Sequence, residues 1–532
     1  MDTRRLILFV IFSFSIMLLW DAWQQQQAPT PVTAQEAAST PSADKPQENG
    51  FMLTKGTRIS VKTDRYAAVI DTVGGDLRQL SLLEHQADDN SGPYELMSDA
   101  SAKKLYVAQT GLKGDGLPTH YASFTTTATD YTLQPDQDTL EVRLTTPETN
   151  GVAVDKIYRF HRGQYLIDVI YEIKNNSDKA ISPSVYYQII HDNESNQGSK
   201  MMPTFTGGAY FTKADNYNKI KFDDMAKKDV SINAKDGWIG LVQHYFVSAW
   251  VPQSNADRKF YTTKLSDHDF SIGTILSVGD IAPGTTKSVD AKLFSGPQAH
   301  DDLETAAPGL EFVVDYGILT VIAKPLMWLL THIHDLVKNW GIAIIVLTIL
   351  IKAAFFKLSA SGYRNMAHLR EIAPRMQALK DKFGDDKQKL QQAMMEMYRT
   401  EKINPMGGCL PILVQIPVFI SLYWVLLGSV ELRHAPFFGW IQDLSATDPY
   451  FVLPVLMGAT MIIQTFLNPP PTDPIQAKVM KIMPVAFSIF FFFFPAGLVL
   501  YWLVNNILSI WQQWAINRMI HTEALTKKGN GK

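Results

Sequence analysis

One ionisable residue lies well inside an otherwise apolar stretch, residues 341–358, which has the sequence GIAIIVLTILIKAAFFKL and a second lysine, Lys357, near its end. The inner residue is Lys352, and Thr348 lies one helical turn before it on the same face. An ammonium group at the centre of a membrane helix costs about 2.5–3.5 kcal/mol on insertion scales, so it requires a compensating environment. Two interpretations stay open. Lys352 either extends to the headgroups near the helix end marked by Lys357, or faces a polar recess formed with other helices.

Polar residues also occur in the other long apolar segments of the chain. They are Gln415, Ser421, Gln464, Asn505 and Asn506. Each alone would stabilise a helix pair by about 0.6 kcal/mol on average. Their recurrence together with a lysine favours a hydrophilic, positively charged recess inside a helix bundle. Prolines within the same segments would bend the helices and help to open it.

Several kinds of membrane machine leave signatures that this sequence lacks. It has no chain of intramembrane Asp, Glu and His residues for proton relay, no inverted repeat, no carbonyl filter motif and no nucleotide-binding loop. Cys409 is the only cysteine, so no intramolecular disulfide can form. We expect no catalysed reaction, no cofactor and no metal. The alternatives are a channel or transporter, and a carbohydrate-processing enzyme tethered by its membrane half.

The polar and apolar residues are segregated along the 532-residue chain, and the net charge of −3 does not suggest nucleic acid as the main partner. Residues 1–23 carry Arg4 and Arg5 before an apolar run, which predicts an uncleaved membrane anchor whose basic end is cytoplasmic. Residues 24–54 are rich in Gln, Pro, Ala, Thr and Ser up to about position 50. This segment is therefore predicted to be a flexible linker.

Residues 55–310 consist of short runs in which apolar and polar residues alternate. The clearest alternating apolar positions are Leu140, Val142, Leu144, Ile167, Val169, Tyr171, Ile173, Val289, Ala291 and Leu293. This period of two predicts a large antiparallel β-sandwich, outside the cytoplasm. His191, Asp192 and Glu194 form a polar triplet in a predicted loop. Such triplets are common, so a scaffold or docking domain is favoured over an enzyme.

The remainder of the chain is predicted to be helical, with six transmembrane helices in total. The segments are an amphipathic interfacial helix at 320–339, the second transmembrane helix at 340–358, a cytoplasmic helical hairpin at 359–404, the third to sixth transmembrane helices at 409–429, 450–467, 482–495 and 496–515, and a basic cytoplasmic tail at 516–532. Ten Lys and Arg against six acidic residues place the segment 357–402 in the cytoplasm. Both basic termini are then cytoplasmic only if the number of spans is even.

The hairpin carries methionines on its apolar stripes, among them Met376, Met394 and Met397. Methionine is flexible and polarisable, so these side chains could form an adaptable surface for apolar client segments. Packing between the two helices of the hairpin explains them equally well.

Long motifs in the chain closely resemble the YidC/Oxa/Alb family of membrane protein insertases. They are EKINPMGGCLPILVQIPVFISLYWVL, GSVELRHAPFFGWIQDLSATDPY and FFPAGLVLYWLVNN, with RISVKTD and GGDLRQL in the β domain and DDKQKLQQAMMEMY in the hairpin. The resemblance covers essentially the whole chain. It implies a groove of five helices, open to the cytoplasm and to lipid, and a large periplasmic domain of the Gram-negative type.

The resemblance also implies roles for individual residues. The essential positive charge of the family maps onto Lys352, where many members have arginine, and Thr348 matches a functionally sensitive threonine. Tyr501 and Trp502 match a tyrosine pair in the last span, with tryptophan at the second position. The substrate path would further include Gln415, Ile416, Pro417, Phe419, Ser421 and Asn505.

The implied activity is insertion of integral inner-membrane proteins, with help in their folding and assembly, alone or with the Sec translocon. The partners would be nascent membrane proteins, the lipid bilayer, the Sec translocon and the ribosome, with the signal recognition particle receptor as a further candidate. The chain would be a multi-pass protein of the bacterial inner membrane, with both termini in the cytoplasm and the β domain in the periplasm.

Overall fold

The computed structural model describes residues 53–101, 104–193, 204–384, 386–401, 410–467 and 474–529. The chain divides after Val314 into a strand-rich unit and a helical unit. The predicted membrane anchor, nearly all of the predicted linker, and Glu194 lie outside the described residues.

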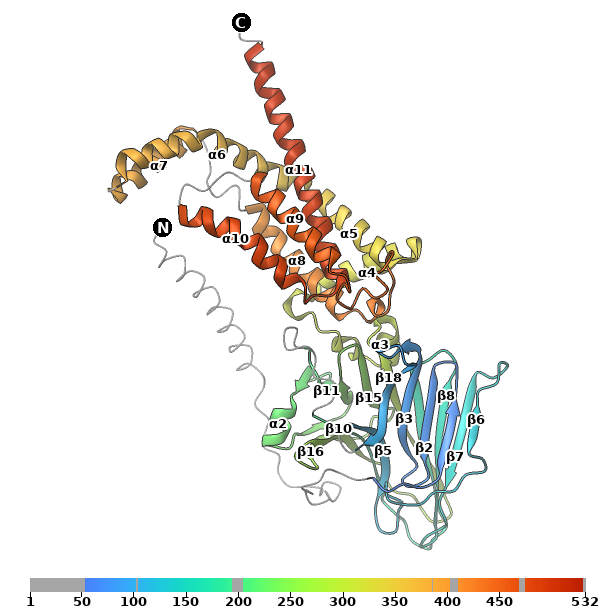
Figure 1. Ribbon diagram of the computed structural model, residues 1–532. Coiled ribbons are helices and arrows are strands. Elements are labelled where there is room, and N and C mark those ends of the chain that lie inside the picture. Colours follow the sequence, from blue (N-terminus) through green and yellow to red (C-terminus); the bar gives the residue numbers. More distant parts are fainter. Residues whose placement is uncertain are drawn as a thin grey trace. The chain divides into compact units, whose positions relative to one another are not determined.

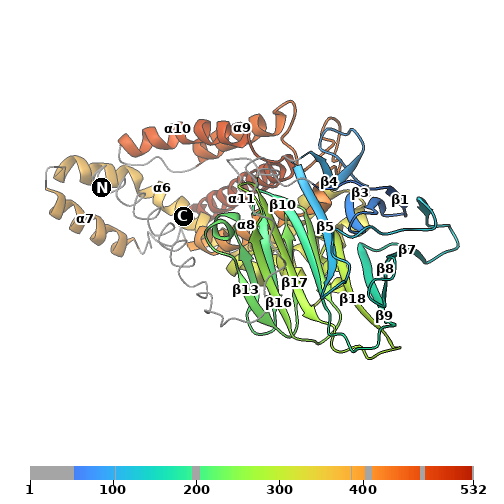
Figure 2. The same ribbon diagram turned by 90° about the horizontal axis from the view of Figure 1, so that it is seen from below.

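Two large sheets make up the strand-rich unit (Figures 1 and 2). Among the described residues, the first sheet has ten strands in the order β13-β16-β17-β10-β5-β4-β3-β2-β1-β6. They are β1 (Arg58–Lys62), β2 (Tyr66–Asp71), β3 (Asp76–Gln86), β4 (Pro93–Ser101), β5 (Lys104–Lys113), β6 (Asp130–Thr132), β10 (Ser184–Asp192), β13 (Ser231–Ala234), β16 (Arg258–Lys264) and β17 (Asp269–Ser277).

The second sheet has eight strands in the described residues, in the order β12-β11-β14-β15-β18-β9-β8-β7. They are β7 (Thr139–Thr145), β8 (Val152–His161), β9 (Leu166–Asn175), β11 (Gly207–Thr212), β12 (Asn216–Ile220), β14 (Trp238–Val242), β15 (Phe246–Pro252) and β18 (Thr286–Pro297). The unit also contains the helices α2 (Phe222–Lys227), α3 (His300–Ala306) and η1 (Leu310–Val313).

The two sheets enclose one apolar core, so the unit is a β-sandwich. The alternating positions on β7, β9 and β18 are fully buried, which confirms the predicted strands: Val142, Leu144, Ile167, Val169, Tyr171, Ile173, Ala291 and Leu293. Contacts cross between the sheets. The Thr110 hydroxyl lies 2.7 Å from that of Tyr171, and the ring of Tyr187 lies 5.1 Å from that of Trp250.

Two features of the sheets differ from the prediction. β1 and β6 run parallel, whereas the alternating pattern predicted only antiparallel strands. His191 and Asp192 are buried at the end of β10, so their assignment to a loop was wrong. Eight of the nine residues of β10 are buried. A strand covered on both faces lacks the polar alternation by which a half-exposed strand is recognised.

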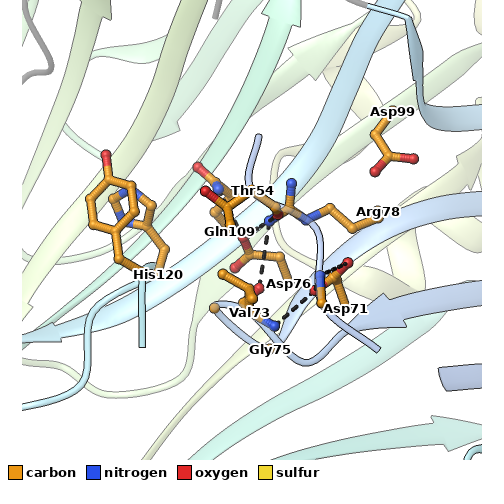
Figure 3. Close-up of polar contacts among 12 residues, drawn as sticks. Thr54, Asp71, Val73, Gly75, Asp76, Arg78, Asp99, Gln109 and His120 are labelled. Atoms are coloured by element: carbon orange, nitrogen blue, oxygen red, sulfur yellow. Dashed lines mark hydrogen bonds and ion pairs between the residues drawn. The ribbon is translucent and has the colours of Figure 1, made fainter. Parts of the chain in front are cut away.

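A buried polar cluster lies inside the sandwich where β3 approaches β5 and β8 (Figure 3). Asp76 accepts a hydrogen bond of 2.8 Å from Gln109 and forms an ion pair of 3.2 Å with Arg78. The Lys156 ammonium donates to the Gly74 carbonyl at 3.0 Å and lies 4.0 Å from the Asp76 carboxylate. Three rings surround this ammonium at 5.5–5.9 Å, those of Phe124, Tyr158 and Tyr171.

Helices form the second unit (Figure 1). Those among the described residues are α4 (Thr320–Val337), α5 (Trp340–Ala354), α6 (Phe356–Phe383), α7 (Lys387–Thr400), α8 (Leu410–Gly428), α9 (Val452–Leu467), α10 (Pro474–Phe491) and α11 (Ala496–Gly529), with the short turns η2 (Gly317–Leu319) and η3 (Val430–Leu432). The last helix, α11, extends well beyond the predicted segment 496–515. It packs against α5, α6, α8 and α9, so it contributes to most of the helical core.

The start of α5 is fixed by three contacts. Asn339 caps the helix, because its side-chain oxygen accepts a hydrogen bond of 2.9 Å from the Ile342 N–H. Its side-chain nitrogen donates to the Phe437 carbonyl at 3.0 Å. Gly341 packs directly on the same phenylalanine, where a Cβ would come within 2.0 Å of the ring. These contacts determine which face of α5 is turned inward, and hence where Lys352 lies.

The chain bends sharply just after Lys352. α5 ends at Ala354, and its direction differs by 66° from that of Phe356–Leu369 at the start of α6. Phe355, at the junction, has φ −90° and ψ 9°, outside helical values. The predicted segment 340–358 is therefore a helix with a bend near its end rather than one straight rod.

The connection between α8 and α9, residues 433–450, packs on the first turn of α11. The N–H groups of Ala496 and Gly497 donate to carbonyls of this connection at 2.7 and 2.8 Å. Asp448 caps the start of α9, accepting a hydrogen bond of 2.7 Å from the Leu453 N–H. The connection thus fixes α9 and α11 relative to each other.

By length and composition, Gly317–Val337 is the one described helix that could cross a membrane alone. α5 together with the start of α6 also meets the criterion if the bent pair is one span. Three shorter apolar helices are Leu413–Gly428, Val452–Leu467 and Ile482–Phe491. Large apolar side chains are exposed on α4, including Val321, Trp328 and Leu336.

Candidate functional site

Lys352 lies in the last turn of α5 and is half-buried. Its ammonium donates a hydrogen bond of 2.7 Å to the Ser509 hydroxyl on α11. Ser509 in turn donates to the Asn505 carbonyl at 2.7 Å, and its hydroxyl also contacts that of Tyr363 on α6. We call Lys352, Ser509 and Tyr363 the Lys352 cluster. Among the described residues, no carboxylate forms an ion pair with Lys352, so its positive charge is not neutralised there.

Thr348 and Ser421 are buried, with 1% and 0% of their surface exposed, and each bonds to its own helix. The Thr348 hydroxyl donates to the Ile344 carbonyl at 2.7 Å. Ser421 donates to the Pro417 carbonyl at the same distance. Hydroxyls that bond to the carbonyl four residues back slightly bend a helix. Neither residue is joined to Lys352 by a hydrogen bond.

Gln415 links α8 to α6. Its side-chain nitrogen donates a hydrogen bond of 2.9 Å to the Ser359 hydroxyl, four residues beyond the bend at Phe355. Pro417 lies two residues further along α8, and because proline has no N–H the helix loses one internal hydrogen bond there. Ile416 is 42% exposed and takes no part in this contact.

An aromatic cluster joins α8, α10 and α11. The ring of Phe419 lies 5.6 Å from those of both Tyr501 and Trp502, and it is nearly parallel to the Trp502 ring, at 11°. Trp502 also packs on Phe491 at 4.5 Å and on Phe494 at 5.5 Å. Offset or edge-on aromatic pairs add about 0.5–1.5 kcal/mol each beyond their buried area. The structure therefore brings three predicted site residues, Phe419, Tyr501 and Trp502, together.

Two asparagines on α11 have different surroundings. Asn505 supplies the carbonyl that accepts from Ser509, so it supports the Lys352 cluster through its backbone. Asn506 projects to α9, where its side-chain nitrogen donates to the Thr460 hydroxyl at 3.2 Å. Asn505 is thus bonded within α11, whereas Asn506 joins α11 to α9.

The predicted hairpin methionines lie apart from these groups. Met376 follows Ser359 by 17 residues, which is about 26 Å along a straight helix. Its sulfur accepts a hydrogen bond of 3.5 Å from the Tyr398 hydroxyl, which connects α6 to α7. Met394 and Met397 are half-buried on α7. These three residues belong to the hairpin and not to the Lys352 cluster.

No group of three or more His, Cys, Asp and Glu side chains that could hold a metal ion occurs in the part of the chain that the structure describes. The polar groups that contact Lys352, directly or through Ser509, are two hydroxyls and the Asn505 carbonyl. Such groups can bind and orient a polar chain.

Two family models match the chain and together cover most of it. Residues 58–329 match the YidC periplasmic domain, and residues 332–523 match the 60Kd inner membrane protein. The membrane protein insertase YidC of Methylobacillus flagellatus is 63% identical, with 100% of each chain covered. The chain belongs to the YidC family of membrane protein insertases.

A second relative agrees with this assignment. The membrane protein insertase YidC of Nitrosospira multiformis is 50% identical over 98% of each chain. Among solved structures, an active YidC insertase with its first transmembrane domain resolved is 17% identical and has a TM-score of 0.39, covering 86% of this chain and 92% of that one. In keeping with the family models, the chain has a large β-sheet-rich periplasmic domain and a helical C-terminal region, and it is an inner-membrane protein.

Sequence reasoning missed three residues that contact the predicted site: Ser359, Tyr363 and Ser509. Ser509 follows Asn505 by four residues, so helical periodicity could have placed it on the same face. Ser359 and Tyr363 lie beyond the bend at Phe355. The sequence assigned them to the cytoplasmic hairpin and gave no reason to place them beside α8 and α11.

Proposed function

We propose that this chain inserts integral inner-membrane proteins through a hydrophilic groove whose positive charge is Lys352, and that it helps them to fold and assemble. The observation that carries the proposal is the environment of Lys352. Its ammonium is half-buried between α5 and α11 and is bonded to a hydroxyl rather than to an acid. The ammonium is therefore held in position while its charge is not neutralised, and it can attract an incoming anionic group.

The first step is the entry of a polar or acidic segment of the client. A negative charge near an ammonium in a partly dehydrated site is stabilised more strongly than in bulk water, because the effective dielectric constant is lower. Lys352 thereby lowers the cost of moving that segment away from the cytoplasm. Gln415 and Asn505 add hydrogen-bonding groups along the path.

The second step is the release of the apolar client helix into lipid. Ile416, exposed on α8, and the half-buried Phe419 offer an apolar surface along which the helix can move, and the buried Tyr501 and Trp502 support Phe419 from within. Transfer of apolar surface out of water supplies the free energy. The insertase itself needs no nucleotide and catalyses no chemical reaction.

The topology that fits this function has six spans, with both termini in the cytoplasm and the β-sandwich in the periplasm. α4, with its exposed Val321, Trp328 and Leu336, would lie in the outer interface. The hairpin of α6 and α7 would extend into the cytoplasm, where its methionines could contact emerging client segments. Together with the basic tail it would approach the ribosome, and the sandwich would approach the Sec translocon.

Photocrosslinking of the full-length protein to a stalled nascent membrane protein tests this proposal. Probes would be placed at Gln415, Tyr501 and Asn505, with Trp328 on α4 as the control position. Adducts at the first three positions are expected, because all three would line one path. If the client crosslinks at none of them while the protein is folded and membrane-inserted, the groove function is excluded.

A further inference from the structure

Gln512 on α11 is a buried polar residue that the groove described so far does not use. Only 3% of its surface is exposed, and neither its side-chain nitrogen nor its side-chain oxygen has a hydrogen-bond partner among the residues that the structure describes. Leaving a buried donor or acceptor unpaired costs about 1–3 kcal/mol per group. Leucine or methionine would fill a similar volume without this cost, so packing alone does not explain a glutamine here.

The position of Gln512 connects it to the Lys352 cluster. Asn505, Ser509 and Gln512 are spaced i, i+4 and i+7, so the three side chains project from the same side of α11. Ser509, which holds the Lys352 ammonium, precedes Gln512 by about 4.5 Å along the helix axis. Gln512 is therefore the next polar group on that side, beyond Lys352 and away from the aromatic cluster at Tyr501 and Trp502.

The chemistry of the two groups differs. The ammonium of Lys352 can only donate hydrogen bonds, so it favours carboxylates and carbonyl oxygens. A carboxamide donates and accepts at once, which matches a peptide group or the side chain of Asn or Gln. The unpaired carboxamide of Gln512 can therefore bind uncharged polar groups of the client, which the Lys352 ammonium binds less well.

We propose that Gln512 is a second client-contacting residue, whose amide pairs with the uncharged polar side chains of the segment being translocated. This inference rests on the proposed function and names a substrate class for it. Lys352 would serve acidic segments, and Gln512 would serve neutral polar ones.

The adjacent residue provides a matched control. Gln513 is also a glutamine and is equally buried, at 2%. Its side-chain nitrogen, however, donates to the Leu467 carbonyl at 3.2 Å, at the end of α9. Gln513 joins two helices, whereas Gln512 joins none through its side chain.

The experiment compares full-length Gln512→Leu, Gln512→Met and Gln513→Leu in proteoliposomes. Two clients share one apolar helix, and their translocated segments are rich either in Asn and Gln or in Asp. We expect both Gln512 variants to insert the neutral client about fivefold less efficiently, the effect of roughly one lost hydrogen bond, and the acidic client normally. Their melting temperatures should be equal to or above that of the parent, whereas that of Gln513→Leu should be lower.

The outcomes separate this inference from the proposed function. Normal insertion of both clients by the two Gln512 variants, or an equal loss for both clients, would overturn the role of Gln512. A photocrosslinking probe at position 512 that captures the neutral client, with none captured from position 513, would support it. The dependence of the acidic client on Lys352 is measured in the same system, so failure of the groove itself would be recognised independently.

Discussion

Two lysines that are withdrawn from water, Lys156 in the strand-rich unit and Lys352 in the helical unit, have opposite surroundings. Lys156 in the β-sandwich is fully buried, donates to a carbonyl, lies 4.0 Å from the Asp76 carboxylate and is surrounded by three aromatic rings. Lys352 in the helical unit is half-buried and is bonded to the hydroxyl of Ser509. The first charge is compensated on several sides, and the second is held by a neutral group.

The difference between the two lysines shows which buried charge can still interact with a ligand. A paired and enclosed charge has no remaining capacity to interact with a ligand, and its removal leaves a partner unpaired. A charge held only by a hydroxyl can still attract an anion that arrives from outside. We therefore assign Lys156 to the stability of the sandwich and Lys352 to the handling of client proteins.

Substitution of Lys156 is expected to have the largest effect on stability. Replacing it by methionine should destabilise the sandwich by about 3–5 kcal/mol, because the buried Asp76 carboxyl would lose one of its two cationic neighbours. The double variant Asp76→Asn, Lys156→Met removes the carboxylate charge but also takes it from the buried Arg78, so it should recover only part of this loss. Hydrogen exchange of β8 in the full-length protein measures both. Unchanged protection in the single variant would mean that Lys156 is not a structural charge, and the contrast with Lys352 would fail.

The pH dependence of the sandwich sharpens the same contrast. Burial raises the pKa of Asp76 to about 6, although Lys156 and Arg78 oppose the shift. Burial also lowers the pKa of Lys156 to about 7. The folded state favours the neutral form of each group, so stability falls as the pH rises from about 4 to 6 and increases again from about 7 to 10, by at most about 1.4 kcal/mol per pH unit for each group.

The sandwich should therefore be least stable between pH 6 and 7. Hydrogen exchange of β3 and β8 at pH 5, 6.5 and 8, corrected for the intrinsic exchange rate, would show the least protection at the middle value. The double variant Asp76→Asn, Lys156→Met should lose this minimum. A minimum of equal depth in the double variant would assign the pH dependence to other groups.

Substitution of Lys352 should change stability much less than substitution of Lys156. Lys352→Leu should change the stability of the helical unit by no more than about 1 kcal/mol, because no described acid loses its partner and a charge is removed from an apolar setting. Thermal unfolding in nanodiscs measures this change. A loss as large as that of Lys156→Met would make Lys352 a structural residue.

Substitution within the aromatic cluster at Phe419 is expected to have the smallest effect on stability. The rings around Lys156 contact the ammonium, whereas the cluster at Phe419 packs on itself, and its Trp502 precedes Ser509 by about 10.5 Å along α11. Phe419→Leu should destabilise the helical unit by about 1 kcal/mol. Ile416→Leu on the same helix should have almost no effect, since Ile416 is 42% exposed. Equal effects of the two variants would show that the stack with Trp502 contributes nothing.

The strands of the sandwich could be predicted where one face is polar. β7, β9 and β18 alternate clearly, because their inward residues meet the other sheet and their outward residues meet water. β10 is buried on both faces, so its residues show no alternation and His191 appeared to lie in a loop. The parallel pairing of β1 with β6 depends on how distant segments meet, which local patterns do not encode.

For the site, the residue types were predictable and most of their partners were not. A lysine inside an apolar helix is evident from the sequence alone, and the resemblance to a known family singled out Phe419, Tyr501 and Trp502. The bonds of Lys352 to Ser509 and of Gln415 to Ser359 depend on the bend at Phe355 and on the register of α11. Neither feature leaves a local signal in the sequence.

The most direct test of the central claim exchanges charges between Lys352 and a client. Insertion into proteoliposomes would be measured for clients that carry Asp or Lys in the translocated segment, with the parent protein, Lys352→Arg, Lys352→Leu and Lys352→Glu. For the Asp client we predict normal insertion by Lys352→Arg, an approximately tenfold loss in Lys352→Leu, the equivalent of about 1.4 kcal/mol, and a larger loss in Lys352→Glu. The Lys client should be inserted better by Lys352→Glu than by the parent. Insertion of the Asp client at the same level by all four proteins would contradict the account.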